Sequence, residues 1–168
     1  MSAIAKGYAV DRVAGDLDAL DHRDYYVDVG GETRVRGHNA EERPWRVGIE
    51  KPDAGRGQAQ EILRLTDMSV ATSGDYRNYY VSDDTNRYTH IIDPRSGQPV
   101  KQTLASVSVL ADSCWRADAI ATALIVLGAE AGRDWVEAHP GVEAYFIERD
   151  ASGVLTDFCT PGFRALLK

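Results

Sequence analysis

Residues 113–128 read Ser-Cys-Trp-Arg-Ala-Asp-Ala-Ile-Ala-Thr-Ala-Leu-Ile-Val-Leu-Gly, a run of mostly good helix formers. Ser113 is a candidate N-cap, and Gly128 is a candidate stop at the other end. Apolar side chains cover nearly the whole circumference of this predicted helix, which is typical of a helix surrounded by other elements. We therefore expect a buried helix here, packed inside the domain.

One carboxylate, Asp118, lies within this apolar helix. Thr122 follows four residues later, so its hydroxyl is expected on the same side of the helix. A buried carboxylate without a partner is costly, and hard cations such as Mg²⁺ take carboxylate, hydroxyl and carbonyl oxygens. The pattern is compatible with a metal site. The alternative, which this stretch alone favours, is an acid placed by the helix dipole, with Thr122 bonding back to a backbone carbonyl.

The other segments predict an α+β domain. Ile4–Leu20 has apolar residues near helical spacing, and Ala129–His139 continues as a further helix. Most remaining segments alternate as strands and are joined by short polar or glycine-containing turns. We expect two or three helices and seven to nine strands in mixed or mainly antiparallel sheets. The expected strands are 25–37 with an interruption at Gly30-Gly31, 44–50, 68–72, 79–82, 87–92, 105–110, 142–147 and 154–158. Residues 58–67 fit a helix or a strand, and their neighbours favour a strand.

Composition and charge narrow the class of protein. The chain has 168 residues, of which 43% are hydrophobic, enough for one domain with a sizeable core. Its net charge of −7 argues against nucleic acid as the main partner, because such binding needs clustered Lys and Arg. No apolar run approaches a membrane span, and the first residues lack a signal-peptide pattern. Cys114 and Cys159 lack metal-type spacing and are compatible with one disulfide or two free thiols.

Two further stretches carry polar groups in settings that suit a ligand. Lys6 lies near the start of the first predicted helix among small residues, where free helical N–H groups favour an anion. Residues 71–79 put small side chains at a strand end, followed by Ser, Asp, Arg and Asn groups that can hydrogen-bond. A solvated lysine and an ordinary polar connection are the alternatives for these two stretches.

His90 is the one histidine in a strand-like apolar setting. An imidazole can act as a general base near neutral pH, although a strand histidine is more often structural. His22, His38 and His139 lie in expected turns or at a helix end, and we assign them no chemistry.

Five motifs in a fixed order give the sequence a specific resemblance. They are AIAKGYAVD (3–11), VDVGGE (27–32), ATSGDY (71–76), HIIDPRSG (90–97) and ADAIATAL (117–124). In this order they resemble the ApbE family of FAD:protein FMN transferases, from about Ser2 to at least Gly128. The resemblance implies an ApbE-like, T-fold-like α+β fold.

The resemblance also implies an enzyme that uses Mg²⁺ and FAD. Family members transfer FMN from FAD to a threonine or serine hydroxyl of a target protein, and some instead hydrolyse FAD to FMN and AMP. The implied metal ligands are three residues: Asp118, Thr122 and, through its backbone carbonyl, Ala3. The implied flavin contacts are Lys6 and the backbone near Ile92, and the implied base for the acceptor hydroxyl is His90.

The family carries a further N-terminal portion, which contacts FAD and usually includes a secretion signal. Here Met1-Ser2 stands where the family commonly has Asp-Leu. We therefore expect residues 1–168 to be the C-terminal catalytic portion of an ApbE-like protein, with a periplasmic location inferred from the family. The expected partners are FAD and an acceptor protein with a Thr or Ser flavinylation site. A flavin-binding fragment without turnover and an FAD pyrophosphatase are the alternatives.

Overall fold

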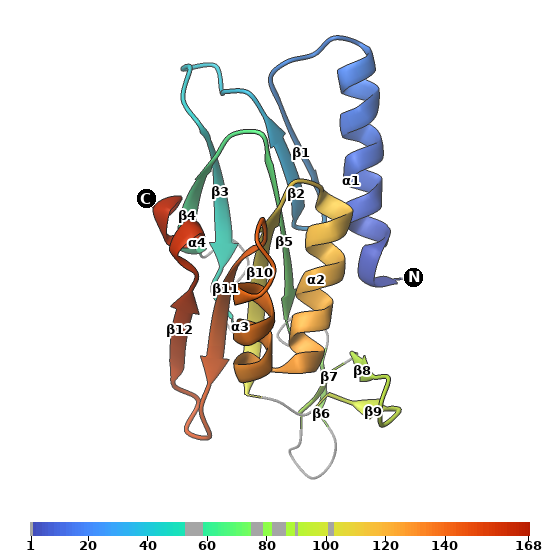
Figure 1. Cartoon of the computed structure of the whole chain (residues 1–168), viewed down its shortest axis with the longest axis vertical. Helices are drawn as coiled ribbons and strands as arrows, with labels where there is room; N and C mark the ends of the chain where they lie inside the picture. The colour runs from blue at the N-terminus through green and yellow to red at the C-terminus, as the bar shows by residue number, and fades with distance from the viewer. Residues whose placement is uncertain (1, 53–58, 75–78, 82–86, 90, 101–102) are drawn as a thin grey trace.

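A six-stranded sheet forms the middle layer of the structure (Figure 1). The structure is a computed structural model that describes residues 2–52, 59–74, 79–81, 87–89, 91–100 and 103–168. All strand pairs in these residues are antiparallel, which confirms the predicted α+β fold. The sheet order is β1 (Tyr25–Val29), β2 (Glu32–Arg36), β5 (Met68–Gly74), β10 (Leu104–Ala111), β11 (Glu143–Arg149) and β12 (Leu155–Cys159).

Three helices cover one face of this sheet: α1 (Ser2–Ala19), α2 (Cys114–Leu127) and α3 (Ala129–Glu137). The helix predicted from residues 113–128 is α2, and Ser113 and Gly128 flank it as expected. It packs on β5 and β10 with α1 along its side, and every residue of β10 is buried, on one face of the sheet or the other. The apolar composition of α2 therefore follows from its position between the sheet and α1.

The opposite face of the sheet is covered by a hairpin and a short helix. The hairpin is β3 (Trp45–Glu50) with β4 (Ala59–Leu65), and the helix is α4 (Pro161–Ala165). Their apolar side chains form a second core with the sheet residues that face away from α1, α2 and α3, which include Val70, Leu110 and Tyr145. Helix α4 was not predicted from the sequence, because five residues are too few to show a helical period.

Four short strands lie at the end of α2 that is remote from Ser113 (Figure 1). They are β6 (Tyr79–Val81), β7 (Arg87–Thr89), β8 (Ile92–Asp93) and β9 (Gln98–Pro99). The predicted hairpin between 79–82 and 87–92 is present as β6 and β7, and its residues Ser82 and His90 lie outside the described residues. Ile92, which was expected in the second arm, belongs to β8 instead. Arg95 donates to the backbone carbonyl of Val126 at 3.3 Å, which attaches the β8–β9 hairpin to the last turn of α2.

Gly30 and Gly31 form the turn of a hairpin, so the expected interruption within one strand was wrong. Val29 pairs with Glu32, which leaves a two-residue loop between β1 and β2. The two glycines have φ of 65° and 98°, the left-handed conformation that such loops require at both positions. The turn brings β2 back along β1 and places Glu32 at its start.

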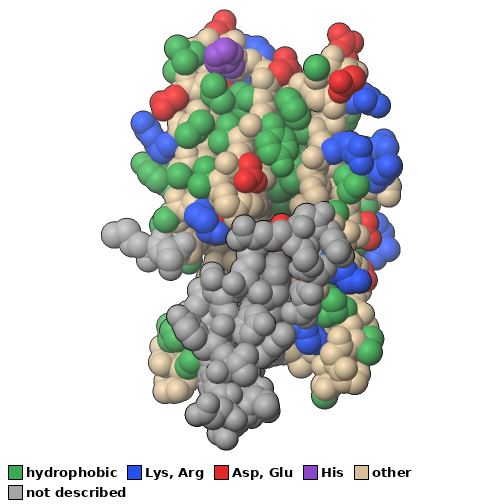
Figure 2. Space-filling model, turned by 180° about the vertical axis from the view of Figure 1, so that it is seen from behind, with side chains coloured by type: hydrophobic (Ala, Val, Ile, Leu, Met, Phe, Trp, Pro, Cys, Tyr) green, Lys and Arg blue, Asp and Glu red, His purple; other side chains and the backbone are tan. Residues whose placement is uncertain are grey.

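Figure 2 shows the molecule from the side opposite to that of Figure 1. Hydrophobic side chains lie along this face among polar ones, and Lys and Arg gather along one edge. Tyr26 and Trp45 are close together, with ring centroids 5.8 Å apart. Among the residues that the structure describes, no helix has the length and hydropathy needed to cross a membrane.

Helices α1 and α2 are in close backbone contact at Gly7. A Cβ atom at this position would lie 2.7 Å from the Cα of Trp115, closer than packed carbon atoms allow. Glycine is therefore required by the close contact between the two backbones, since Gly7 lies inside a regular helix. Gly15 lies two turns further along the same helix, and a Cβ there would meet nothing within 4 Å.

We predict that Gly7→Ala lowers the free energy of unfolding by about 1–3 kcal/mol, because the added methyl group must push α1 away from α2. Gly15→Ala is the matched control and should raise it by about 0.5–1 kcal/mol, since alanine is the better helix former. Chemical denaturation of both variants measures the two effects. Equal stability changes in the two variants would contradict the assignment of Gly7 to the helix contact.

Candidate functional site

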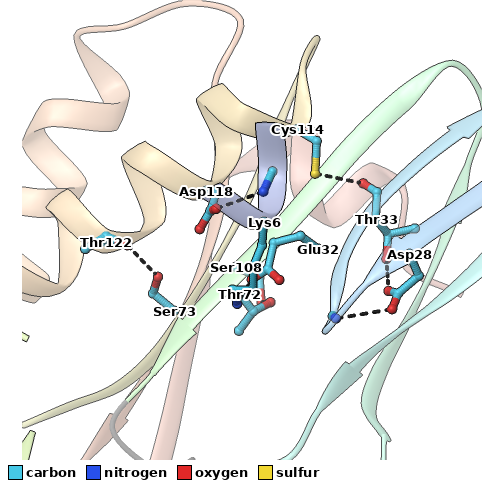
Figure 3. Close-up of polar contacts among 12 residues, drawn as sticks. Lys6, Asp28, Glu32, Thr33, Thr72, Ser73, Ser108, Cys114, Asp118 and Thr122 are labelled. Carbon is cyan, nitrogen blue, oxygen red and sulfur yellow. Dashed lines mark hydrogen bonds and ion pairs between the residues drawn. The ribbon is translucent and has the colours of Figure 1, made fainter. Parts of the chain in front are cut away.

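Asp118 lies at the contact between α1 and α2 (Figure 3). Its Oδ2 accepts the backbone N–H of Gly7 at 3.0 Å, and only 4% of the residue is exposed. In a regular helix the N–H of Gly7 points toward the carbonyl of Ala3, four residues earlier. The carboxylate of Asp118 therefore lies beside the first turn of α1, where that carbonyl is located.

A second carboxylate, Asp11, fixes the beginning of α2. Its Oδ1 accepts the N–H of Cys114 at 3.1 Å, and its Oδ2 accepts the N–H of Trp115 at 2.8 Å. Arg34 of β2 completes the group with an ion pair of 2.6 Å. Ser113 occupies the predicted N-cap position, but its side chain makes no capping hydrogen bond.

The capping role of Asp11 was not predicted from the sequence, because the helix that it caps lies more than one hundred residues away. One feature of the sequence does point to this role. Asp11 follows Gly7 by four residues, so both lie on the same face of α1. A glycine and an acid at this spacing in a helix are compatible with a face that meets another helix end.

Thr122 lies one turn after Asp118 on α2, and its hydroxyl is 3.0 Å from the hydroxyl of Ser73 (Figure 3). Ser73 belongs to the end of β5, where Ala71 and Gly74 are also small. Asp118 is the fifth residue of α2, outside the first turn, where a dipole effect would be strongest. These positions weaken the alternative in which the helix dipole alone accounts for Asp118.

Lys6 lies one residue before Gly7 and binds Glu32 at the start of β2. The distance between Lys6 Nζ and Glu32 Oε1 is 2.6 Å. The Lys6 side chain is 47% exposed, whereas that of Glu32 is only 2% exposed. Lys6, for which a solvated lysine was the alternative, is therefore one half of an ion pair whose acidic partner is buried.

The charges of Lys6, Glu32 and Asp118 shift the pKa values of the two carboxyl groups. Burial raises the pKa of Asp118, and the Gly7 N–H and the positive charge of Lys6 oppose that rise. Burial also raises the pKa of Glu32, Lys6 opposes the rise, and the negative charge of Asp118 adds to it. A single lysine thus stabilises two carboxylates that repel each other, in a position where an additional cation would be favoured.

The remaining predicted residues lie elsewhere or outside the described chain. Ile92 is half exposed in β8, next to the last turn of α2. Eight residues of helix separate Asp118 from Val126, which corresponds to about 12 Å along α2. Lys6 and Ile92 therefore lie near different ends of α2. His90 lies outside the residues that the structure describes, so its role remains a prediction.

The oxygen atoms near Asp118 suit a hard cation. A carboxylate, a hydroxyl and a helical carbonyl are ligands that Mg²⁺ accepts. Within the described residues, no group of three or more His, Cys, Asp or Glu side chains is arranged to hold a metal.

Cys114 and Cys159 are free, buried thiols, and burial raises the pKa of both, which disfavours a thiolate ligand.

Residues 1–146 match the family model described as the ApbE family. The chain belongs to the ApbE family. It is 47% identical over 139 residues to the FAD:protein FMN transferase of Vibrio cholerae, covering 83% of this chain and 41% of that protein. It is 40% identical over 157 residues to the FAD:protein FMN transferase of Haemophilus influenzae, covering 93% of this chain and 45% of that protein.

Solved ApbE structures share the fold. The apo form of the flavinyl transferase ApbE of Pseudomonas stutzeri superposes with a TM-score of 0.84 at 43% identity, over 98% of this chain and 50% of that one. The flavin transferase ApbE of Vibrio cholerae gives 0.85 at 40% identity, over 99% and 52%. The chain therefore spans about half the length of the ApbE proteins that it matches.

We predict that Asp118→Asn stabilises the metal-free chain at neutral pH. A carboxyl whose pKa is higher in the folded state destabilises the fold above both pKa values, and this loss disappears as the pH falls. Asparagine still accepts the Gly7 N–H but carries no charge. The unfolding temperature measured with a chelator should rise at about pH 7, by about 2–4 °C per kcal/mol gained, and the difference from wild type should shrink toward about pH 4.

The control is Asp16→Asn, which removes an exposed carboxylate from α1 and should produce no such gain. A lower unfolding temperature for Asp118→Asn than for wild type at neutral pH would show that the negative charge of Asp118 stabilises the metal-free fold.

Proposed function

We propose that this chain provides the catalytic portion of a Mg²⁺-dependent FAD:protein FMN transferase. The observation that carries the proposal is the buried carboxylate of Asp118 at the contact between α1 and α2, beside Lys6. The names of the relatives support the same reaction. Residues 1–168 are proposed to be the C-terminal portion of such a protein, since they match about half of each relative.

The proposed magnesium ligands are the carboxylate of Asp118, the hydroxyl of Thr122 and the carbonyl of Ala3. The donor set fits the ion, because all three atoms are oxygen and Asp118 makes no ion pair with the side chains that the structure describes. When bound there, Mg²⁺ would neutralise charge on the pyrophosphate of FAD.

FAD is proposed to lie along α2. The proposed flavin contacts are Lys6, near the start of α1, and the backbone near Ile92, beside the last turn of α2. The residues at the end of β5, beside Thr122 of α2, are small. This arrangement holds the nucleotide at two points and orients the pyrophosphate toward Asp118.

The reaction needs a nucleophile and a base. The hydroxyl oxygen of a Thr or Ser in the acceptor protein forms a bond to the phosphorus of the FMN half. The bond from that phosphorus to the bridging oxygen breaks, and AMP leaves with the electron pair. His90 is proposed to take the hydroxyl proton, since an imidazole is neutral and basic near pH 7.

The proposed location is the periplasm, and the proposed partner is a protein with an exposed Thr or Ser acceptor site. The test is incubation of the chain with FAD, Mg²⁺ and a threonine-containing acceptor peptide, followed by mass spectrometry. Flavinylated peptide supports transfer. FMN and AMP without flavinylated peptide indicate the pyrophosphatase alternative, and bound but intact FAD indicates a flavin-binding fragment.

We predict that Asp118→Ala lowers the Mg²⁺-dependent transfer rate by about 100-fold or more, because the charged ligand of the cation is lost. The rate of formation of flavinylated acceptor peptide, with release of AMP, is measured over a Mg²⁺ titration. Asp134→Ala removes an exposed carboxylate from α3 and should leave the rate unchanged. Wild-type turnover by Asp118→Ala would remove Asp118 from the proposed metal site.

We predict that His90→Ala retains FAD binding but lowers the transfer rate by about 10²–10⁴-fold, the usual contribution of a general base. FAD affinity is measured by flavin fluorescence, and transfer by mass spectrometry of the acceptor. His38→Ala changes an exposed histidine and should alter neither. Equal transfer rates for wild type and His90→Ala would overturn the assignment of His90 as the base.

A further inference from the structure

Glu32 is a buried carboxylate that the proposed reaction does not use. Its side chain is 2% exposed, at the start of β2, directly after the Gly30-Gly31 turn. Oε1 binds Lys6 at 2.6 Å. Oε2 is buried and has no hydrogen-bond partner among the residues that the structure describes. A buried carboxylate oxygen without a donor costs free energy, so a role in the folded chain alone does not explain Glu32.

The surroundings of Glu32 show what could approach Oε2. A Cβ atom on Gly30 would lie 3.5 Å from Lys6 Cδ and 3.9 Å from Glu32 Oε2, so the turn packs against this ion pair. Thr33 pairs with Val70 on β5, which makes the small Ala71 the next neighbour of Glu32. The interaction between Glu32 and Asp118 places Glu32 near the proposed metal site (Figure 3).

Two other ion pairs join α1 to β2, and their acids differ from Glu32 in burial or in hydrogen bonding. They are Asp11 with Arg34 and Asp18 with Arg36. Asp11 uses both oxygens, on Arg34 and the first N–H groups of α2, and Asp18 is partly exposed to solvent. Only Glu32 among these three acids combines near-complete burial with an oxygen left without a donor in the described structure.

We propose that Glu32 has two roles in the ligand site: Oε1 holds the Lys6 amine in position, and Oε2 accepts a hydrogen bond from an N–H or O–H group of the bound nucleotide. This inference rests on the proposed function, because it takes FAD as the ligand. FAD carries such donors in both halves, on the flavin ring and ribityl chain and on the adenosine. The shared chemistry is a neutral hydrogen-bond donor next to an anionic group that Lys6 binds.

The experiment compares wild type, Glu32→Gln, Lys6→Met and the double variant. Glutamine preserves the shape and the acceptor for Lys6 but presents an NH₂ group where a ligand donor needs an acceptor. Dissociation constants for FAD, riboflavin and ADP are measured by fluorescence and calorimetry, without an acceptor protein. Asp18→Asn is the matched control, because it breaks another α1–β2 ion pair.

We expect Glu32→Gln to weaken FAD binding by about 10-fold or more, the usual value of a hydrogen bond to a charged group. Asp18→Asn should leave FAD affinity unchanged. The double variant should bind FAD more tightly than the product of the single losses predicts, because Glu32 acts partly through Lys6. A loss of affinity for riboflavin but not for ADP assigns the donor to the flavin half, and the reverse assigns it to the adenosine half.

Unchanged FAD affinity in Glu32→Gln overturns the inference and leaves the transfer proposal intact. The same affinity loss in Glu32→Gln and Asp18→Asn also overturns it, because the effect would then come from loosening α1. Glu32-dependent FAD binding by a chain that transfers no FMN supports the inference and overturns the transfer proposal. A folded wild-type chain that binds none of the three ligands overturns both.

Discussion

The close contact of α1 with α2 is the constraint on which the site depends. Glycine at position 7 lets the two backbones meet, and two carboxylates then join the helices in opposite directions. Asp11 reaches from α1 to the first N–H groups of α2, and Asp118 reaches from α2 to an N–H group of α1. Because each helix supplies the acceptor for the other, the position of Asp118 beside the first turn of α1 is fixed from both sides.

Much of the fold follows from local patterns in the sequence. The apolar run of α2, its flanking residues and the alternation of the central strands all indicate the observed elements. The burial of Asp118 and its need for a partner could be anticipated, because a charge within an apolar helix needs a partner. The paired glycines were interpreted as a break in one strand, although their position between two alternating segments is also the pattern of a tight hairpin.

The parts that sequence could not provide depend on contacts between distant segments. Glu32 resembles an ordinary strand residue beside a turn, and its burial becomes visible only when α1 lies over β2. Asp11 resembles a solvated helix residue, and its capping role requires α2 to be in place. No local period or spacing reports such tertiary contacts, whereas the resemblance to a family pointed to Asp118, Thr122 and Lys6 as candidate site residues through their motifs.

The same contacts have a consequence for how the chain folds. Gly7 and Asp118 are 111 residues apart, and Asp11 and Cys114 are 103 apart. Joining such distant segments requires a large loop to close, so the contact between α1 and α2 belongs to the slow, non-local part of folding. A nucleotide or cation bound between these helices would then mainly lower the unfolding rate and leave the folding rate nearly unchanged, because its site is absent until the chain is nearly folded.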